Sequence, residues 1–359
     1  MHLKTLKITG WRNYTGENTI FSPGINLFLG YNGQGKTNLL EAIYFLSCGQ
    51  SPRTAKIDEL INWAGNYFYL KGEVNTDQAN TFIEMGGARD GRRITKIDGI
   101  PVQRLAELSQ VLTAVFFMPE DLYLVKGGPA RRRRFLDMEI GQLNASYRHA
   151  SLEYKKVLRE RNALLKSKKQ DKLVLEVLTK KLTELAGPIA KMRQDYLDKL
   201  SILARLKHRK LSDNRENLSL KYKWSIKPGS STTEILEMFS QVSKLEQRYM
   251  STMLGPHKDD FTFLVNGADL RTFGSQGQQR TAILSLKLAE LDLFKSETGE
   301  YPVLLLDDVL SELDEIRKAK LFEYLSGRIQ TFISSAEPLS SQTKFKAYRI
   351  EAGSISEGV

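Results

Sequence analysis

The sequence predicts an α/β fold with a mixed sheet, interrupted by an inserted and mainly helical lobe. Three observations predict it. A glycine-rich loop at 30–37 stands between a strand-like and a helix-like apolar segment, and an apolar segment at 303–308 ends in two aspartates, 271 residues beyond Lys36. A helix-rich, basic stretch lies between these two segments. We therefore expect a discontinuous α/β lobe at 1–118 and 255–359, and a helical lobe at 119–254.

The loop at 30–37 fits the phosphate-binding pattern G-x-x-x-x-G-K-[ST]. Its glycines permit a tight turn that points backbone N–H groups inward, and the following helix offers its N-terminus to anions. Lys36 is placed to reach the β- and γ-phosphates of a nucleotide, and the Thr37 hydroxyl suits Mg²⁺. The predicted contacts are Gly30, Tyr31, Asn32, Gly33, Gln34, Gly35, Lys36 and Thr37. A glycine turn that binds nothing is the alternative, and the flanking strand and helix disfavour it.

Two segments near this loop predict strands. Residues 3–8 alternate weakly in polarity, and Arg12 with Asn13 follows them within an aromatic cluster. This cluster predicts a contact with adenine or phosphate, but a strand end packed on the core explains it equally well. Residues 67–102 predict antiparallel strands, with a hairpin turn at 98–99.

The middle of the chain predicts a short antiparallel helical hairpin. Apolar residues recur at steps of three and four from 136 to 164 and again from 174 to 203, on either side of a polar turn at 166–171. Gly187-Pro188 is expected to kink or break the second helix. Ser231 and Glu234 predict a capping box that opens a helix running to about residue 254.

Positive charge is concentrated in this middle segment. Residues 126–210 contain 23 Lys and Arg residues against 9 Asp and Glu residues, a net charge of +14 in a chain of net charge +11. Such segmental imbalance predicts a polyanionic partner, most often nucleic acid, although a solvated lysine-rich helical face is the alternative. The expected DNA contacts are Arg53, Arg131, Arg132, Lys166, Lys168 and Lys169.

The remaining composition excludes several classes. One cysteine, Cys48, excludes an internal disulfide framework, and with four scattered histidines it leaves no structural zinc site. No apolar run reaches the roughly 18 residues of a membrane helix, and the first residues do not resemble a signal peptide. We expect a cytoplasmic protein without a membrane partner.

The aspartates at 307–308 complement the phosphate loop. Asp307 at a strand end is expected to hold Mg²⁺ together with Thr37, because hard oxygen ligands suit that ion. Asp308 is expected to be the catalytic base that orients or deprotonates the attacking water, with Lys36 as its catalytic partner. A capped strand end without a metal is the alternative.

A second anion site is predicted at 274–280. Ser275 and Gly277 precede a long apolar helix, and a helix N-terminus with such residues binds anions. An ordinary helix cap is the alternative. Two anion sites in one chain suggest that one ATP is held from two sides.

These motifs, in order, resemble the Walker A, signature, Walker B and D-loop elements of an ABC-type ATPase head, the group that includes Rad50 and SMC proteins. The cluster at 11–14, the Gly-Gly-Pro and arginine run at 127–137, the segment 255–260 and the segment 274–280 resemble the RecF family of bacterial recombination mediators over essentially the whole chain. The resemblance implies an ATP-dependent homodimer, with Ser275, Gly277, Gln278 and Asp314 of one copy near the ATP held by the other. It also implies a clamp on double-stranded and gapped DNA with slow hydrolysis, which helps RecO and RecR load RecA onto gaps covered by single-strand binding protein.

The sequence also departs from the ABC pattern. Asp308 stands where related ATPases carry glutamate, no glutamine occurs at 116–121, and Ser335 stands where a histidine is expected. The cluster of His257, Asp259 and Asp260 could suggest a metal, but an incomplete ligand set favours a loop that supports the signature.

Other functions are less well supported. A translocase would need further helicase motifs, and a transporter subunit would not need a basic helical insert. An SMC- or Rad50-like structural ATPase of another DNA-maintenance pathway is the closest alternative, but the short hairpin argues against a long tether.

Overall fold

The structure, a computed structural model, describes residues 1–76, 79–167, 169–325, 327–338 and 344–358. The chain divides into two compact units, unit 1 at Met1–Asp121 with Lys287–Val359 and unit 2 at Leu122–Leu286. No helix within the described residues combines the length and apolarity that a membrane crossing needs.

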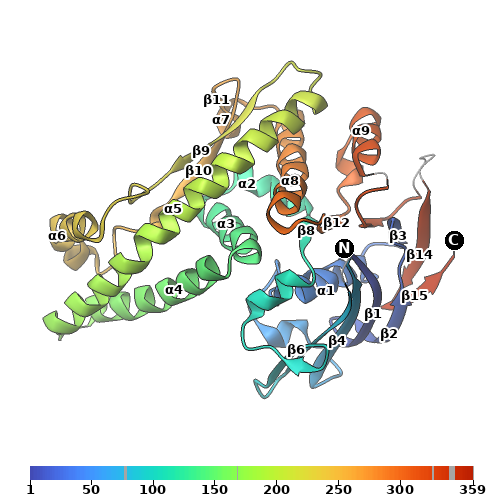
Figure 1. Ribbon diagram of the computed structural model, residues 1–359, viewed down its shortest axis with the longest axis horizontal. Helices are drawn as coiled ribbons and strands as arrows, with labels where there is room; N and C mark the ends of the chain where they lie inside the picture. The colour runs from blue at the N-terminus through green and yellow to red at the C-terminus, as the bar shows by residue number, and fades with distance from the viewer. Residues whose placement is uncertain (77–78, 168, 326, 339–343, 359) are drawn as a thin grey trace. The chain divides into compact units, whose positions relative to one another are not determined.

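Unit 1 contains the sheet that carries the phosphate loop (Figure 1). Its strand order is β15-β14-β3-β13-β12-β8, and β14, β3, β13, β12 and β8 run parallel. The strands are β3 (Ile25–Leu29), β8 (Ala114–Phe117), β12 (Val303–Asp307), β13 (Thr331–Ser335), β14 (Phe345–Glu351) and β15 (Ser354–Glu357). Because β3, β8 and β12 are buried along their whole length, they read as continuous apolar runs. Parallel strands bring their carboxyl ends to one edge, which places the loop after β3 beside the end of β12.

A second, antiparallel sheet completes unit 1, in the order β2-β1-β4-β5-β6-β7. Its strands are β1 (His2–Trp11), β2 (Tyr14–Ile20), β4 (Tyr67–Asn75), β5 (Asn80–Ala88), β6 (Arg93–Ile97) and β7 (Ile100–Pro101). Helix α1 (Lys36–Cys48) contacts strands of both sheets and is buried at most positions, so it forms the core between them. Helix α9 (Glu315–Leu325) also belongs to this unit. The predicted hairpin at 98–99 is confirmed, with φ of +50° at Asp98 and +79° at Gly99.

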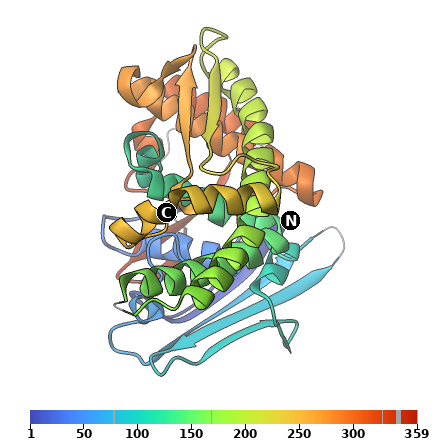
Figure 2. The same cartoon turned by 90° about the vertical axis from the view of Figure 1, so that its left-hand side faces the viewer.

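Unit 2 is mainly helical, with a small sheet in the order β11-β10-β9 (Figures 1 and 2). Helices α4 and α5 form the predicted antiparallel hairpin, and β9 packs along α5. The capping box between Ser231 and Glu234 is present at the start of α6. The helices are α2 (Tyr123–Lys126), α3 (Pro129–Leu143), α4 (Ala145–Lys166), α5 (Lys172–Leu211), α6 (Thr232–Tyr249) and α7 (Leu270–Phe273), and the strands are β9 (Leu218–Lys223), β10 (Asp260–Val265) and β11 (Ala268–Asp269).

The helices of unit 2 differ from the expectation at two places. The apolar seam from 136 to 164 belongs to two helices, because Asn144 leaves the helical conformation and accepts the Tyr147 N–H at 2.8 Å as the cap of α4. The expected break at Gly187-Pro188 is absent, since α5 is one helix of 40 residues. Tertiary packing overrides the proline here, because Ala186, Gly187, Ile189 and Ala190 are all buried.

The second boundary also lies elsewhere than expected. Residues 255–286 were expected in the α/β lobe, but β10 pairs with β9 over six residue pairs and contacts α3, which assigns this segment to unit 2. The boundary falls within α8 (Gln276–Thr298), between Leu286 and Lys287. Because α8 is a continuous helix, no turn or linker in the sequence marks this boundary.

Candidate functional site

The loop between β3 and α1 has a backbone that requires glycine. Gly33 and Gly35 adopt φ of +81° and +118°, a region that other residues rarely enter. A Cβ atom at Gly35 would lie 2.6 Å from the Asn13 side-chain amide, and one at Gly30 would collide with the Ile350 carbonyl. The three glycines are therefore needed for shape, as the sequence predicted.

Neighbouring turns hold the loop in place from outside. Asn13 Nδ2 donates to the Gln34 carbonyl at 2.9 Å, and the Tyr14 hydroxyl donates to the Gly35 carbonyl at 3.1 Å. On the other side, the backbone N–H of Ala352 donates to Gln34 Oε1 at 2.6 Å. The side chains of Asn13 and Tyr14 thus hold the loop backbone, Ala352 holds the Gln34 side chain, and neither Asn13 nor Gln34 lines the cavity described below.

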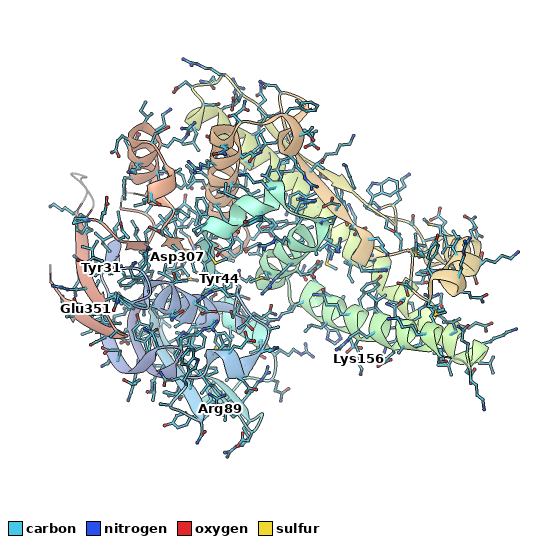
Figure 3. The ribbon with its side chains drawn as sticks, turned by 180° about the vertical axis from the view of Figure 1, so that it is seen from behind. Tyr31, Tyr44, Arg89, Lys156, Asp307 and Glu351 are labelled. Atoms are coloured by element: carbon cyan, nitrogen blue, oxygen red, sulfur yellow. The ribbon has the colours of Figure 1, made fainter. Side chains whose placement is uncertain are left out.

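Lys36 folds its side chain back over the loop. Its Nζ donates to the carbonyls of Gly30 at 2.6 Å and Tyr31 at 3.0 Å. Burial lowers the pKa of Lys36, and the nearby carboxylates of Asp308 and Asp307 oppose that shift. The ammonium group lies inside the ring of backbone that a phosphate would enter, while the Tyr31 side chain stays largely exposed (Figure 3).

Thr37, Asp307 and Ser334 form a hydrogen-bonded cluster at the ends of α1, β12 and β13. The hydroxyls of Thr37 and Ser334 donate to the same Asp307 oxygen, at 2.9 and 2.7 Å. Burial raises the pKa of Asp307, and the two hydroxyl donors counteract this effect. The Thr37 hydroxyl and the Asp307 carboxylate are hard oxygen groups within reach of one ion. This donor set fits Mg²⁺, which takes one or two protein ligands and fills its shell with water and phosphate oxygens.

Asp308 has an unusual backbone conformation, with φ of +52°. Its N–H donates to Ser334 Oγ at 3.0 Å, which holds the turn after β12. Left-handed backbone at a non-glycine residue costs about 1–3 kcal/mol and clusters at functional sites. Asp308 is one of the residues that line the cavity beside the loop.

The loop and the strand ends enclose a cavity of about 310 Å³. Typical ligand pockets have volumes of roughly 300–1,000 Å³, and this cavity is at the lower end of that range. It therefore suits a phosphate chain better than a complete nucleotide. Its lining joins five predicted loop residues and both aspartates to three others: Asn32, Gly33, Gly35, Lys36, Thr37, Asn38, Arg53, Asp307, Asp308 and Ser334. Ser334 and Asn38 were not predicted. Ser334 could have been found from the sequence, because it is a hydroxyl residue at the carboxyl end of β13, the strand next to β12.

Arg12 and Arg53 both bind Glu41, a fully buried carboxylate of α1. Arg12 makes a bidentate pair with Glu41 at 2.9 and 2.8 Å and does not line the cavity, and its contact with a nucleotide stays a prediction. The neighbouring Trp11 is buried against Phe45 and Phe68, which agrees with the alternative of a packed strand end. Arg53 was predicted to contact DNA, but it lies at the edge of the phosphate cavity, 2.8 Å from Asn38 Oδ1.

The segment at 274–280 begins helix α8 in unit 2. Ser275 Oγ accepts the Gln278 N–H at 3.2 Å, and Gln278 Oε1 accepts the Ser275 N–H at 2.9 Å. This reciprocal pair is a helix cap, and it leaves Ser275 and Gly277 exposed at the first turn. The same residues can therefore form both a helix cap and an anion site, because the hydroxyl of the capping serine can still donate its proton.

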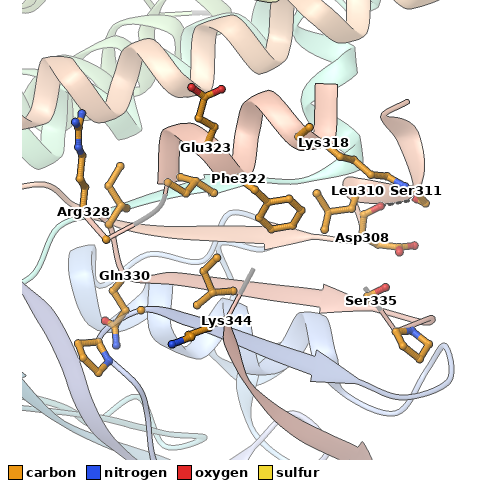
Figure 4. Close-up of a pocket in the computed structure, with 18 of the residues that line it drawn as sticks. Asp308, Leu310, Ser311, Lys318, Phe322, Glu323, Arg328, Gln330, Ser335 and Lys344 are labelled. Carbon is orange, nitrogen blue, oxygen red and sulfur yellow. Dashed lines mark hydrogen bonds between the residues drawn. The ribbon is translucent and has the colours of Figure 1, made fainter. Parts of the chain in front are cut away.

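Asp314 caps helix α9 in unit 1. Its Oδ1 accepts the Arg317 N–H at 2.8 Å, and its side chain is exposed and away from the phosphate cavity. A larger cavity of about 1420 Å³ lies beside α9, and Asp308 and Ser335 contribute to its wall (Figure 4). The Ser335 hydroxyl donates to the Glu337 carbonyl at 2.6 Å, so its proton is already used within its own loop.

The residues predicted to bind DNA have different environments in unit 2. Arg131 is exposed and lies 4.6 Å from the ring centre of Tyr123, and Lys166 and Lys169 are exposed near the hairpin turn. Arg132 is buried, with a bidentate pair to Asp260 at 2.6 and 3.0 Å, so the prediction for Arg132 is corrected. Lys168 lies outside the described residues.

The cluster at 257–260 supports the interior of unit 2. Asp259 accepts from Arg193, Tyr222 and the Ser225 N–H, while His257 contacts the Tyr154 hydroxyl and the Thr252 carbonyl. Among the described residues no group of three potential ligands could hold a metal ion.

The phosphate loop, the Asp-Asp strand and the sheet order define a P-loop ATPase head of the ABC type. The chain matches the RecF/RecN/SMC N terminal domain over residues 2–353. It is 40% identical to the DNA replication and repair protein RecF of Ligilactobacillus salivarius, which it matches over 99% of this chain and 98% of that protein, and 41% identical to RecF of Bacillus velezensis, over 99% and 100%. The chain belongs to the RecF family.

Solved structures agree with this assignment. A structure of the recombination mediator protein RecF-ATP in the RecFOR pathway superposes with a TM-score of 0.92 at 36% identity, over 100% of this chain and 98% of that chain. The Smc head domain of Pyrococcus furiosus superposes with a TM-score of 0.55 at 18% identity, over 99% and 95%, and shows the shared head fold.

Proposed function

We propose that this protein is an ATP-dependent DNA clamp of recombinational repair and replication. The loop at 30–37 holds the phosphates of ATP, with Lys36 exchanging its bonds to the Gly30 and Tyr31 carbonyls for phosphate oxygens. Thr37 and Asp307 hold Mg²⁺, which supplies charge neutralisation at the phosphates when bound. The arrangement of an ammonium, a hydroxyl and a carboxylate around one cavity supports this assignment.

Asp308 is the proposed base for the attacking water. Asp308 lines the cavity, and aspartate reaches less far than glutamate. A shorter base is compatible with slow turnover, so we infer that hydrolysis resets the protein and is weak in the absence of DNA. This behaviour is that of a switch, distinct from a helicase or nuclease.

The second half of the ATP site comes from another copy of the chain. Ser275 and Gly277 are exposed at the N-terminus of the long helix α8, where backbone N–H groups and the free serine proton are available to a γ-phosphate. Gln278 and Asp314 act with them, Gln278 through the cap and Asp314 from the start of α9. ATP would then join two copies into a symmetric dimer.

The basic segment of unit 2 supplies the DNA contacts. Exposed Arg131, Lys166 and Lys169 carry positive charge, as does Lys156 on α4 (Figure 3). Contacts of this kind attract the phosphates of double-stranded and gapped DNA without reading sequence. We infer that RecR and RecO are partners, and that RecA and single-strand binding protein act with the complex at gaps in DNA. We also infer that the protein is cytoplasmic and is associated with the nucleoid when it is bound to DNA.

The single observation that carries this proposal is the hydrogen-bonded set of Thr37, Asp307 and Ser334 beside the Lys36 ammonium. Sedimentation and light scattering with a non-hydrolysable ATP analogue test it, with gapped DNA added in a second series. We expect a dimer only with nucleotide, and a stable ternary complex with DNA. Lys36→Ala should remain a monomer, and a Lys36→Ala protein that dimerises with ATP would refute the shared site.

A further inference from the structure

We propose that Glu216, in the loop between α5 and β9, is a positioning residue for the signature serine Ser275. Glu216 Oε1 accepts a hydrogen bond from Gln278 Nε2 at 2.7 Å. The remaining amide oxygen of Gln278 accepts the Ser275 N–H at 2.9 Å. The Gln278 amide therefore has one orientation, in which it joins the carboxylate on one side to the serine backbone on the other.

This orientation matters because the Ser275 hydroxyl has one proton to donate. Its oxygen already accepts the Gln278 N–H at 3.2 Å. The hydroxyl proton is then free to donate to an anion placed before α8. If Gln278 lost its anchor, the cap would loosen and the serine would sample other rotamers, which costs binding in an interface that must match another copy.

Glu216 is itself held by the end of α5. His208, which is fully buried, brings Nε2 to 3.0 Å from Glu216 Oε2. Its Nδ1 lies 3.0 Å from Ser285 Oγ, and the Ser285 hydroxyl donates to the Thr281 carbonyl at 2.6 Å. One oxygen of Glu216 therefore contacts His208 on α5 and the other contacts Gln278 on α8. The carboxylate joins the two helices in this way.

The next residue fixes the loop that carries Glu216. The Asn217 N–H donates to Asn266 Oδ1 at 2.9 Å, and the Asn266 N–H returns a bond to the Asn217 carbonyl at 2.9 Å. Every contact in this chain lies within unit 2. The long basic helix α5 is therefore connected through His208, Glu216 and Gln278 to the serine that meets ATP.

This inference rests on the proposed function, because it assigns the positioning of Ser275 for an ATP held by another copy. It gives a route by which a displacement of α5, the helix that bears much of the basic charge, alters the position of Ser275. The phosphate loop of the same copy lies outside that route.

The test compares dimer dissociation constants by analytical ultracentrifugation with the non-hydrolysable ATP analogue. Losing a hydrogen bond to a charged group costs roughly tenfold or more in an equilibrium constant. Because the dimer has two such sites, we expect Glu216→Ala to weaken dimerisation by at least about tenfold. Binding of a fluorescent ATP analogue by the monomer should stay within about twofold, since the phosphate loop alone provides it.

Three variants serve as controls. Glu237→Ala removes an exposed carboxylate from α6 and should dimerise as the parent does. Gln278→Glu places two carboxylates face to face and should be impaired. Adding Glu216→Gln to Gln278→Glu restores an amide-carboxylate pair with the roles exchanged, and should recover most of the lost affinity.

The outcomes separate the two proposals. If the parent protein fails to dimerise with nucleotide, the proposed function is wrong, and this inference with it. If the parent dimerises but Glu216→Ala does so equally well, or if the exchanged pair is no better than Gln278→Glu alone, the positioning role of Glu216 is refuted while the shared ATP site stands.

Discussion

Replacing Arg161 by alanine should destabilise unit 2 strongly. Arg161 on α4 is buried, and its guanidinium donates to Glu246 at 2.6 Å, Thr252 at 2.8 Å and Thr179 at 3.0 Å. Glu246 on α6 is buried as well, so truncation leaves a carboxylate without its cation. Breaking one half of a buried ion pair costs about 3–5 kcal/mol.

The loss should be measured by thermal unfolding followed with circular dichroism. For a unit of this size each kcal/mol lowers Tm by about 2–4 °C, so we expect a fall of roughly 6–20 °C. Arg159→Ala on the same helix removes an exposed arginine and should change Tm by less than about 2 °C.

A double variant tests whether the uncompensated charge causes the loss. Arg161→Met with Glu246→Leu replaces both charges by apolar side chains of similar volume and should recover most of the stability. If Arg161→Ala melts within about 2 °C of the parent, the buried pair does not hold α6 to the hairpin as argued.

Three further predictions concern the loop, the interior of unit 2 and DNA. Gly35→Ala should weaken ATP binding by at least about tenfold, since it places a side chain on a backbone at φ +118° and against Asn13. Gly128→Ala is the control, because its methyl group meets no atom within 4 Å. Fluorescence titration compares the two variants, and equal affinities would contradict the loop geometry. Burial lowers the pKa of His257 to about 4. Between pH 6.5 and 4, His257 therefore binds a proton in the unfolded chain but not in the folded chain. The free energy of unfolding should fall by about 3 kcal/mol as pH falls from 6.5 toward 4. Urea titrations should show a flatter pH dependence for His257→Gln, and parallel curves would contradict the role of burial. ATP-dependent DNA binding should weaken at least about tenfold between about 50 and 200 mM salt in fluorescence anisotropy, and a flat response would refute electrostatic contact.

The sequence predicted the parts of the site that a short local pattern defines. The spacing of Gly30, Gly35 and Lys36 requires a strand before and a helix after, and both are present. Asp307 and Thr37 were predicted to hold one Mg²⁺ because hard oxygen ligands suit that ion, and the two side chains are 2.9 Å apart.

The sequence could not predict which charged residues point inward. Arg132 belongs to an arginine run, yet it is buried because Asp260, distant in sequence, pairs with it. Arg12 is committed to Glu41 for the same reason. Such long-range pairs depend on tertiary contacts that no local pattern reveals.

The boundaries were hard to predict for a related reason. The division within α8 coincides with no turn, since one helix contributes to both units. The uninterrupted helix α5 likewise depends on burial around Pro188, which outweighs its local preference to break a helix.

The central claim is that each ATP is held by the phosphate loop of one copy and the signature of another. Mixing Lys36→Ala protein with Ser275→Ala protein tests it most directly by ATP hydrolysis. Each variant alone should be inactive, and a 1:1 mixture should recover part of the parent rate, since only a mixed dimer holds one intact composite site. A mixture as inactive as its components would contradict the shared site.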